Sequence, residues 1–596
     1  MGLFDAAARE YTYISAVTRT LFSMRNVKPE STHTIVDVVE AQARATPDAI
    51  VFYYRDSTMS YAALNAAADR IAHWARQNGI ARGEAVALLM ENRPDYVVAW
   101  LGLLKAGAVA ALINTNLRGT ALAHSLAISG AHHVIVGQEL ADIHRGAEIE
   151  LKPRPTGWSA SGGSTGLEDL DSALQSLPAL PAERAWREGV LCKDRAFYIY
   201  TSGTTGLPKA SNFTHLRMLY MMHGFAGGLN AKASDRMYNV LPLYHSAGGV
   251  CALGPALLTG GSVILKRKFS VHEFWDDVHR YEATLFQYIG ELCRYLLNAP
   301  TARFEHDHTL RAITGNGLRP EIWPLFQQRF AIPRIIEFYG ATEGNVSMLN
   351  YDGKVGAVGR IPLYMRGLMK TRIVKFDIER EEPVRGSDGR CIECEAGEVG
   401  EVIGKISAEP GRSFDGYTTK ADTEKKVLRD VFEAGDSWFR TGDLMRRDAQ
   451  GYFYFVDRIG DTFRWKGENV ATSEVAEALS AVDGVLEANV YGVAVPGYDG
   501  RAGMAALVAR TGFDPAMLAA GLEVRLPVYA RPVFVRLMPE IGITGTFKHR
   551  KIDLVEQGFD PSRISDPLFV FNAQTRCYEP LDSARFADII DGRYKI

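Results

Sequence analysis

The sequence predicts an α/β protein with a large N-terminal body of layered α/β subdomains, a β-rich element and a small α+β C-terminal domain. Between residues 35 and 265, short apolar runs alternate with helical patterns, which favours layers built on mainly parallel sheets. Between residues 397 and 458 the runs become short and alternating, as in residues 452–456, which is typical of antiparallel strands. After Asp457 a smaller unit follows, with one helical pattern before two strand-like runs.

The individual elements follow from the spacing of apolar residues. We expect strands at 49–52, 85–89, 108–112, 133–136 and 197–200, with helices at 61–76 and 96–106. In the C-terminal unit we expect a helix at 473–482 and strands at 487–495 and 505–509. Residues 153–185 are rich in Gly, Ser and Pro, so we expect a surface loop or insertion there.

Residues 11–28 combine helical apolar spacing with basic residues. Tyr11, Ile14, Val17, Leu21 and Met24 share this spacing, and arginines and a lysine lie between and after them. Such a helix either docks on its own protein, the interpretation that we prefer, or lies on an anionic membrane surface.

Composition excludes several classes of protein. The 596 residues include 67 Lys and Arg and 70 Asp and Glu, so the net charge is −3, and a nucleic-acid partner is not expected. Of the six cysteines only Cys391 and Cys394 form a CxxC pair, and no second pair completes a zinc site. We therefore expect reduced thiols and a cytoplasmic protein, peripheral at the inner face of a membrane if residues 11–28 bind lipid.

The strongest local pattern is a predicted strand that runs into a loop of small hydroxylated residues and glycines. The loop contains Thr201, Ser202, Gly203, Thr204, Thr205 and Gly206, and Lys209 follows it. Glycines allow a tight turn with exposed N–H groups, and the hydroxyls and the lysine add further donors, so the pattern favours polyphosphate binding. It is not a Walker A motif, because Leu207 and Pro208 separate the second glycine from the lysine. The alternative is a polar surface loop, since residues 161–166 have a similar composition.

From this loop onward the chain resembles the adenylate-forming superfamily of acyl-CoA synthetases, adenylation domains and luciferases. The resemblance rests on residues 196–209, 338–343, 438–443, 457–469 and 544–548, which occur in the family's order. Residues 287–298, 314–320 and 457–472 further resemble the fatty acid transport protein group, the very long-chain acyl-CoA synthetases.

The resemblance implies a role for each motif. The loop from Thr201 to Lys209 would hold the departing pyrophosphate, Glu343 would bind Mg²⁺, and Thr342 would contact the α-phosphate. The remaining nucleotide contacts would come from Gly315, Asn316, Gly317, Tyr339 and Gly340 at the adenine, and from Asp443 and Arg458 at the ribose. Lys548 would be the catalytic lysine, with Lys551 as the alternative.

A second half-reaction with CoA is also implied. The domains would be an N-terminal helical segment (1–34), an adenylation domain (35–459) and a mobile C-terminal domain (460–596). The C-terminal domain would rotate about a hinge at Gly460 and Asp461, and Gly467 would line the CoA tunnel.

The acid itself is expected to be a long- or very long-chain fatty acid. Residues 241–249 contain no acidic residue, which argues against an amino-acid substrate, and His245 resembles the gate residue of acyl-activating members. A helical stripe of Phe286, Ile289, Leu292 and Leu296 would line an acyl tunnel. The implied substrates are ATP, CoA and fatty acid with Mg²⁺, and the reaction would be coupled to fatty acid uptake. The alternatives are a CoA ligase for a bile or aromatic acid, and a non-catalytic fatty acid carrier at a membrane.

Overall fold

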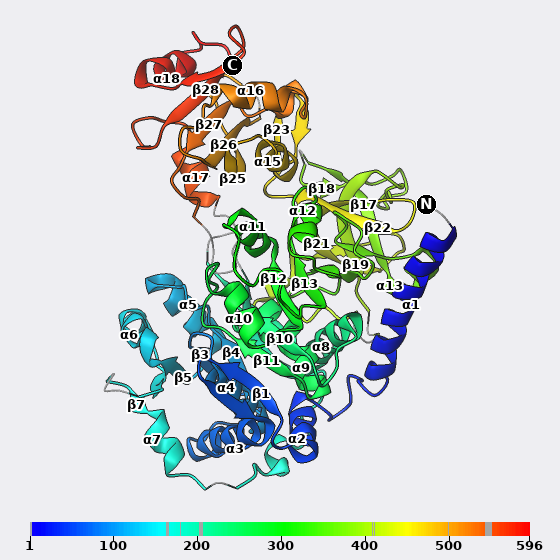
Figure 1. The fold of residues 1–596 in the computed structure, drawn as a ribbon, viewed down its shortest axis with the longest axis vertical. Coiled ribbons are helices and arrows are strands. Elements are labelled where there is room, and N and C mark those ends of the chain that lie inside the picture. The colour runs from blue at the N-terminus through cyan, green and yellow to red at the C-terminus, as the bar shows by residue number, and fades with distance from the viewer. Residues whose placement is uncertain are drawn as a thin grey trace. The chain divides into compact units, whose positions relative to one another are not determined.

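The computed structural model describes residues 3–162, 166–178, 180–201, 207–378, 380–407, 409, 412–498, 500–542 and 551–596 (Figure 1). The chain forms two compact units. The first consists of Met1–Leu318, Ile322–Arg360 and Lys405–Leu428, and the second of Arg319–Glu321, Ile361–Gly404 and Arg429–Ile596. The second unit thus groups the β-rich element with the C-terminal residues, and the domain boundary at residue 459 stays a prediction.

An eight-stranded sheet forms one layer of the first unit. Its order is β15-β14-β13-β12-β10-β11-β1-β2, and only the edge strands β15 and β2 run antiparallel to their neighbours. The strands are β1 (Ile50–Tyr54), β2 (Ser57–Ser60), β10 (Arg236–Asn239), β11 (Ser262–Leu265), β12 (Leu285–Ile289), β13 (Ala312–Asn316), β14 (Ile335–Gly340) and β15 (Ser347–Asn350). The predicted parallel sheet is therefore confirmed here.

A seven-stranded sheet forms the second layer, in the order β7-β6-β5-β3-β4-β8-β9. All neighbours are parallel except β8 and β9, which form an antiparallel pair. The strands are β3 (Ala85–Leu89), β4 (Val109–Leu112), β5 (His133–Gly137), β6 (Thr156–Ala160), β7 (Glu168–Asp169), β8 (Arg195–Thr201) and β9 (Lys209–Thr214).

Helices join the two sheets through one continuous hydrophobic core. The helices of this unit are α1 (Leu3–Met24), α2 (Ile35–Ala45), α3 (Tyr61–Gln77), α4 (Pro94–Lys105), α5 (Gly119–Ser129), α6 (Ala141–Glu148), α7 (Leu170–Gln175), α8 (His215–Leu229), α9 (Leu253–Thr259), α10 (Phe274–Arg280), α11 (Gly290–Asn298), α12 (Trp323–Arg329) and α14 (Lys420–Glu424). Side-chain caps define where two of the longer helices, α3 and α8, begin. The Ser60 hydroxyl accepts from the Ala63 amide at 3.2 Å, and the Thr214 hydroxyl accepts from the Arg217 amide at 3.2 Å.

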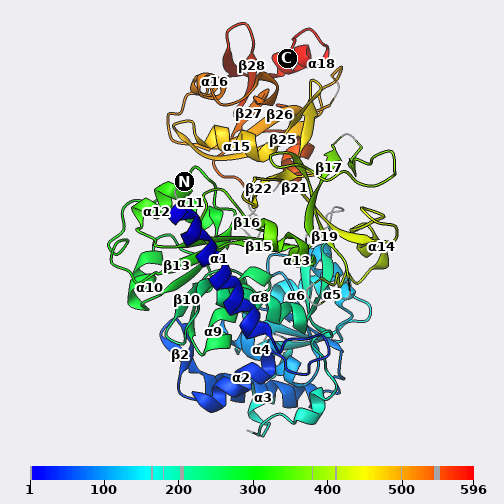
Figure 2. The same ribbon diagram turned by 90° about the vertical axis from the view of Figure 1, so that its right-hand side faces the viewer.

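The N-terminal helix α1 packs along α8 (Figure 2). Gly227 of α8 permits the close approach, because a Cβ added there would lie 2.2 Å from the Thr20 hydroxyl. The Arg19 guanidinium also donates to the Gly227 carbonyl at 3.0 Å. The preferred interpretation of residues 11–28, a helix docked on its own protein, agrees with these contacts.

The second unit is richer in antiparallel strands. Its first sheet has the order β18-β17-β19-β21-β22, and its five-stranded sheet follows the order β25-β26-β27-β28-β29. The elements are α13 (Arg366–Met369), β17 (Thr371–Asp377), β18 (Glu382–Pro383), β19 (Val399–Lys405), β21 (Ser437–Arg447), β22 (Tyr452–Arg458), β23 (Phe463–Trp465), β24 (Glu468–Val470), α15 (Thr472–Ser480), β25 (Val485–Val493), β26 (Ala502–Ala509), α16 (Ala516–Glu523), β27 (Phe534–Leu537), α17 (Ile552–Gln557), β28 (Leu568–Asn572), β29 (Cys577–Pro580) and α18 (Ser583–Ile590). The short strands β16 (Gly359–Arg360) and β20 (Val427–Arg429) complete the chain's strands in the described residues.

Two local predictions are wrong. The stretch 153–185 is not only loop, because β6 and β7 extend the second sheet and α7 follows them. Pairing with β5 stabilises β6 despite its small and polar residues. The stripe of Phe286, Ile289, Leu292 and Leu296 is not one helical face, because Phe286 and Ile289 lie in β12 and only the two leucines lie in α11.

Candidate active site

The candidate phosphate loop joins two antiparallel strands. Thr201 ends β8 and lies directly opposite Lys209, the first residue of β9. Ser202, Gly203, Thr204, Thr205 and Gly206 lie outside the described residues. The hairpin therefore fixes both ends of the loop and puts the lysine at its base.

Lys209 already has an anionic partner. Its Nζ lies 2.7 Å from the Asp422 carboxylate of α14 and 5.9 Å from the centre of the Tyr417 ring. The hydrogen bond from Lys209, followed by that from the Thr419 hydroxyl, lowers the pKa of Asp422.

The second group of predicted residues lies at the carboxyl ends of parallel strands. Gly315 and Asn316 end β13 and lead to Gly317, while Tyr339 and Gly340 end the adjacent strand β14. Thr342 and Glu343 follow one residue later, after Ala341. The carboxyl edge of a parallel sheet is the usual place for a ligand in this kind of fold, since the connecting loops meet there.

Tyr417 connects Glu343 with the strand that begins at Lys209. The Tyr417 hydroxyl donates to the Glu343 carboxylate at 2.9 Å. Its backbone forms an antiparallel bridge with Ser211 of β9, and the Asn212 amide donates to the Gly416 carbonyl at 3.0 Å. Burial, and then the Glu343 carboxylate, raise the pKa of Tyr417, so the phenol stays protonated and remains a donor. The two predicted groups are thus brought together inside the first unit.

Arg217, on the first turn of α8, holds the turn that carries Glu343. Its Nη1 donates to the carbonyls of Thr342 at 2.7 Å and Gly344 at 2.5 Å. Its Nε lies 3.6 Å from the Asp415 carboxylate, and its side chain is only 11% exposed. Arg217 and Asp415 therefore close a ring of contacts around Glu343, because Asp415 lies on the same segment as Tyr417.

Thr342 also contacts the segment predicted to hold the gate. Its hydroxyl lies 3.2 Å from that of the buried Ser246, which directly follows His245. A five-residue π-helix, Ala247–Cys251, begins immediately afterwards. Single π turns are frequent at functional sites. The Gly249 amide donates to the His245 carbonyl at 2.7 Å and fixes the backbone at the predicted gate.

A buried carboxyl group lies beneath the predicted adenine loop. Glu337 of β14 accepts from the Leu318 amide at 3.0 Å and from the Tyr288 hydroxyl. Burial raises the pKa of Glu337 to about 8.

In the second unit, Asp443 and Arg458 lie opposite each other on β21 and β22. The Arg458 Nε is 3.7 Å from the Asp443 carboxylate. The Thr441 hydroxyl accepts from the Asp443 amide at 3.1 Å and itself donates to the Val402 carbonyl at 2.7 Å, which anchors the turn. The pair predicted to bind ribose is thus adjacent.

The predicted hinge follows β22. Asp461 pairs with Lys551, whose Nζ lies 3.0 Å from the carboxylate and donates to the Thr472 hydroxyl at 2.9 Å. Gly460 directly precedes Asp461 in the chain. Lys548 lies outside the described residues. Gly467 has φ +82° and follows Lys466 with φ 51°, as a two-residue turn between β23 and β24 requires.

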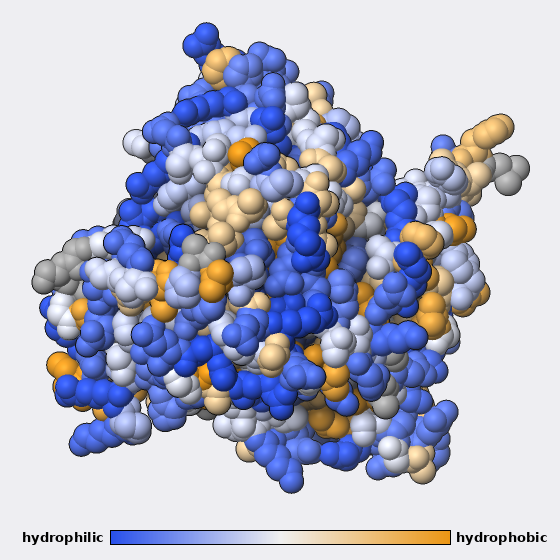
Figure 3. Space-filling model, turned by 90° about the horizontal axis from the view of Figure 1, so that it is seen from below, coloured by the Kyte–Doolittle hydropathy of each residue, from blue (hydrophilic) through white to orange (hydrophobic). Residues whose placement is uncertain are grey.

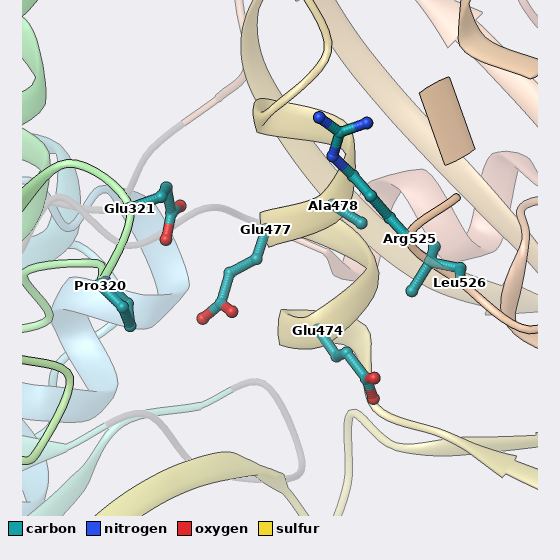
Figure 4. Close-up of a pocket in the computed structure, with 7 residues that line it drawn as sticks. All are labelled: Pro320, Glu321, Glu474, Glu477, Ala478, Arg525 and Leu526. Carbon is teal, nitrogen blue, oxygen red and sulfur yellow. The ribbon is translucent and has the colours of Figure 1, made fainter. Parts of the chain in front are cut away.

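A cleft in the second unit contains none of the predicted residues. It is lined by Pro320, Glu321, Glu474, Glu477, Ala478, Arg525 and Leu526 (Figure 4). Burial and the neighbouring Glu321 raise the pKa of Glu477 to about 7.

Sequence reasoning missed Arg217, Asp415, Tyr417 and Asp422. Each is an ordinary polar residue in its local sequence. Tyr417 contacts Glu343 and Asp422 contacts Lys209, while Arg217 contacts the backbone on either side of Glu343 and is itself approached by Asp415. These contacts arise only when segments about 75 to 210 residues apart meet. The pairing of residues 415–418 with β9 gives no periodic or compositional signal.

Comparisons with known proteins show the family and the fold of the chain. Residues 39–405 match the AMP-binding enzyme family and residues 474–548 match its C-terminal domain. Among solved structures, the chain is similar in fold to an anthranilate–CoA ligase bound to anthranoyl-AMP (TM-score 0.75, 21% identity, 89% of this chain and 98% of that one). It is also similar to a fatty acyl CoA synthetase of Mycobacterium tuberculosis (TM-score 0.60, 25% identity, 88% and 98%). Fold and family matches together define an AMP-forming acid–CoA ligase.

Similar chains of known name narrow this class. The chain is 42% identical to long-chain fatty acid transport protein 1 of Mus musculus over 99% of its own length and 92% of the relative's. It is 41% identical to long-chain fatty acid transport protein 2 of Rattus norvegicus, over 99% of its own length and 95% of the relative's. The chain belongs to the long-chain fatty acid transport protein family of AMP-binding enzymes.

Proposed function

We propose that this enzyme converts long- and very long-chain fatty acids to acyl-CoA. A carboxylate oxygen of the acid attacks the α-phosphorus of ATP, a P–O bond forms, and the bond to pyrophosphate breaks. The CoA thiolate then attacks the acyl carbon of the adenylate and releases AMP. The names of the relatives support a long-chain fatty acid as the substrate. Conversion of the acid to acyl-CoA would trap it and so couple the reaction to fatty acid uptake.

The observation that carries the proposal is the grouping of Lys209, Thr342 and Glu343 around Tyr417. Lys209 and the loop beside it would hold the β- and γ-phosphates, and the Thr342 hydroxyl would donate to the α-phosphate. Charge in phosphoryl transfer is spread over phosphate oxygens, so positioned donors and cations contribute most of the catalysis.

Glu343 fits a magnesium site. Mg²⁺ is held by one or two carboxylates together with substrate phosphates and waters, so a single half-buried carboxylate beside the phosphate loop suffices. Among the described residues no larger group of His, Cys, Asp or Glu could hold a metal ion alone. When bound, the ion would neutralise phosphate charge.

The second unit would supply the remaining groups. Asp443 would accept from both ribose hydroxyls with Arg458 beside it, because a carboxylate offers two acceptor oxygens. Lys548 would bridge the carboxylate and the α-phosphate in the first step. Rotation about Gly460 and Asp461 would then bring Gly467 to the CoA tunnel.

ATP–pyrophosphate exchange across a panel of acids tests the proposal. We expect exchange with C16–C24 fatty acids and little with benzoate or a bile acid. Exchange with benzoate or the bile acid alone would favour the bulky-acid alternative. If the chain binds fatty acid but gives no exchange with any acid, it is a carrier and the proposal fails.

We also propose that α1 docks this enzyme on an anionic lipid surface. The outer face of α1 leaves Phe4, Tyr11, Ile14, Leu21 and Phe22 between 52% and 91% exposed. In Figure 3 the end of α1, on the right, projects with hydrophobic side chains. In the described part of the chain no helix is long and apolar enough to cross a bilayer.

Charge supports a lipid partner for this face. Arg25 and Lys28 are exposed directly after α1, and the Arg25 guanidinium lies 4.1 Å from the centre of the Phe22 ring. Aromatic side chains flanked by basic residues are typical of helices that lie at a membrane interface.

Liposome flotation tests this second proposal. The Phe4→Ser, Tyr11→Ser, Phe22→Ser variant should lose flotation with phosphatidylglycerol vesicles. A matched control, Val524→Ser with Val528→Ser, changes two equally exposed residues of the second unit and should float like the wild type. Equal flotation of all three proteins would contradict the proposal. Loss of a dimer on gel filtration by the α1 variant, without any lipid binding by the wild type, would instead assign the face to a second copy.

A further inference from the structure

Both functional side chains of the phosphate site are engaged by one segment of the same unit. Residues 415–424 contribute Tyr417, which donates to Glu343 at 2.9 Å, and Asp422, which pairs with Lys209 at 2.7 Å. Tyr417 is neutral, and its hydroxyl gives the Glu343 carboxylate a hydrogen-bond donor. Asp422 differs, because it sets a second anion against the ammonium group that would bind phosphate.

The Lys209–Asp422 pair is half-buried. The two side chains are 18% and 22% exposed, and the Thr419 hydroxyl donates to the same carboxylate at 2.6 Å. Thr419 caps the short helix α14, since its hydroxyl also accepts from the Asp422 amide at 3.3 Å. The carboxylate is therefore held in place toward Lys209.

From this geometry we infer that Asp422 is an internal competitor of the nucleotide's phosphates for Lys209. A triphosphate and the Asp422 carboxylate repel each other when both lie against one ammonium group, whether ATP displaces Asp422 or binds beside it. Pyrophosphate is also a polyanion and meets the same competition. Asp422 thus weakens ATP binding and in return promotes the departure of pyrophosphate, after which Lys209 pairs with Asp422 again.

This inference rests on the proposed function and makes a prediction that distinguishes the two. Asp422→Asn keeps the shape of the side chain and removes its charge. The dissociation constant of ATP should fall about two- to fivefold, the effect of one half-buried ion pair, and that of pyrophosphate should fall by a similar factor. AMP lacks the β- and γ-phosphates, so its dissociation constant should not change.

Titration calorimetry with a non-hydrolysable ATP analogue, pyrophosphate and AMP provides the measurement. Glu424→Gln is the matched control, because it removes one negative charge from the same helix. Asp422→Glu should retain wild-type affinities. In a Lys209→Ala background, Asp422→Asn should have little effect on the dissociation constant of ATP, because the ammonium group for which Asp422 and the phosphates compete is absent. The four proteins together form a double-mutant cycle.

The possible results separate cleanly. If the wild type does not bind the ATP analogue, the proposed function fails. If it binds and Asp422→Asn weakens binding, Asp422 positions Lys209 and the competition model is wrong. An unchanged affinity of Asp422→Asn for the ATP analogue would also overturn the inference. So would a gain in the affinity of Asp422→Asn for AMP as large as its gain for the ATP analogue. A gain of the same size for the ATP analogue in the Glu424→Gln control would do the same.

Discussion

Replacement of Arg217 by methionine tests whether the Glu343 turn is held from α8. Methionine keeps an unbranched apolar stem but lacks the guanidinium group, so the packing of the stem is kept while three contacts are lost. These are the hydrogen bonds to the carbonyls of Thr342 and Gly344, and the approach to Asp415 at 3.6 Å. The charge is well shielded, because only 11% of the Arg217 side chain is exposed.

The magnitude follows from what would remain buried. Removal of one partner from a buried charged network typically costs about 3–5 kcal/mol, because the other groups keep their desolvation penalty. We expect the unfolding free energy of Arg217→Met to fall by about that amount. A displacement of the Glu343 turn by about 1 Å should also lower kcat/KM for ATP about 100-fold.

Urea unfolding and ATP–pyrophosphate exchange measure the two effects. Arg217→Lys keeps the charge near Asp415 but lacks the planar fork, so it should recover part of the stability and little of the activity. The control Arg145→Met breaks an exposed pair with Asp142 and should change stability by less than about 0.5 kcal/mol. If the unfolding free energy of Arg217→Met differs from that of the wild type by less than about 0.5 kcal/mol, the reasoning is refuted. Full exchange activity of Arg217→Lys would also refute it.

Four further substitutions probe other parts of the molecule. Burial raises the pKa of Glu337 to about 8, so this carboxyl stabilises the fold most when protonated, and its contribution is lost as the pH rises from about 4.5 through 8. Glu337→Gln should flatten that loss in thermal melts between pH 5 and 8, and an unchanged slope would contradict the assignment. Asp443→Ala should weaken ATP and AMP binding equally, about 10- to 100-fold, because both contain the ribose, as competition titrations would show. Lys551→Met breaks the pair with Asp461 and should alter the thioester step while sparing adenylation, whereas Lys548→Ala should abolish adenylation yet spare CoA transfer from preformed acyl-AMP. The reverse pattern would make Lys551 the catalytic lysine.

Local sequence predicted the elements that depend on local patterns. Strand β3 was expected at 85–89 and lies there, and helix α3 extends one residue beyond the expected 61–76. Apolar periodicity predicts such elements because each must bury one face or both. The stripe from Phe286 to Leu296 failed because helical spacing also fits a strand that runs directly into a helix.

The sequence by itself determined the class of protein, because its motifs resemble those of the adenylate-forming superfamily in the same order along the chain. The roles of the loop after Thr201 and of Thr342 and Glu343 follow from that resemblance and stay predictions. Only the tertiary structure decided how those motifs are held. Arg217, Asp415, Tyr417 and Asp422 gain their contacts when β9, α8 and residues 415–424 come together around Glu343 and Lys209. Hydrogen bonds and ion pairs between distant segments depend on where the backbone places both partners, and that placement leaves no pattern in either segment alone.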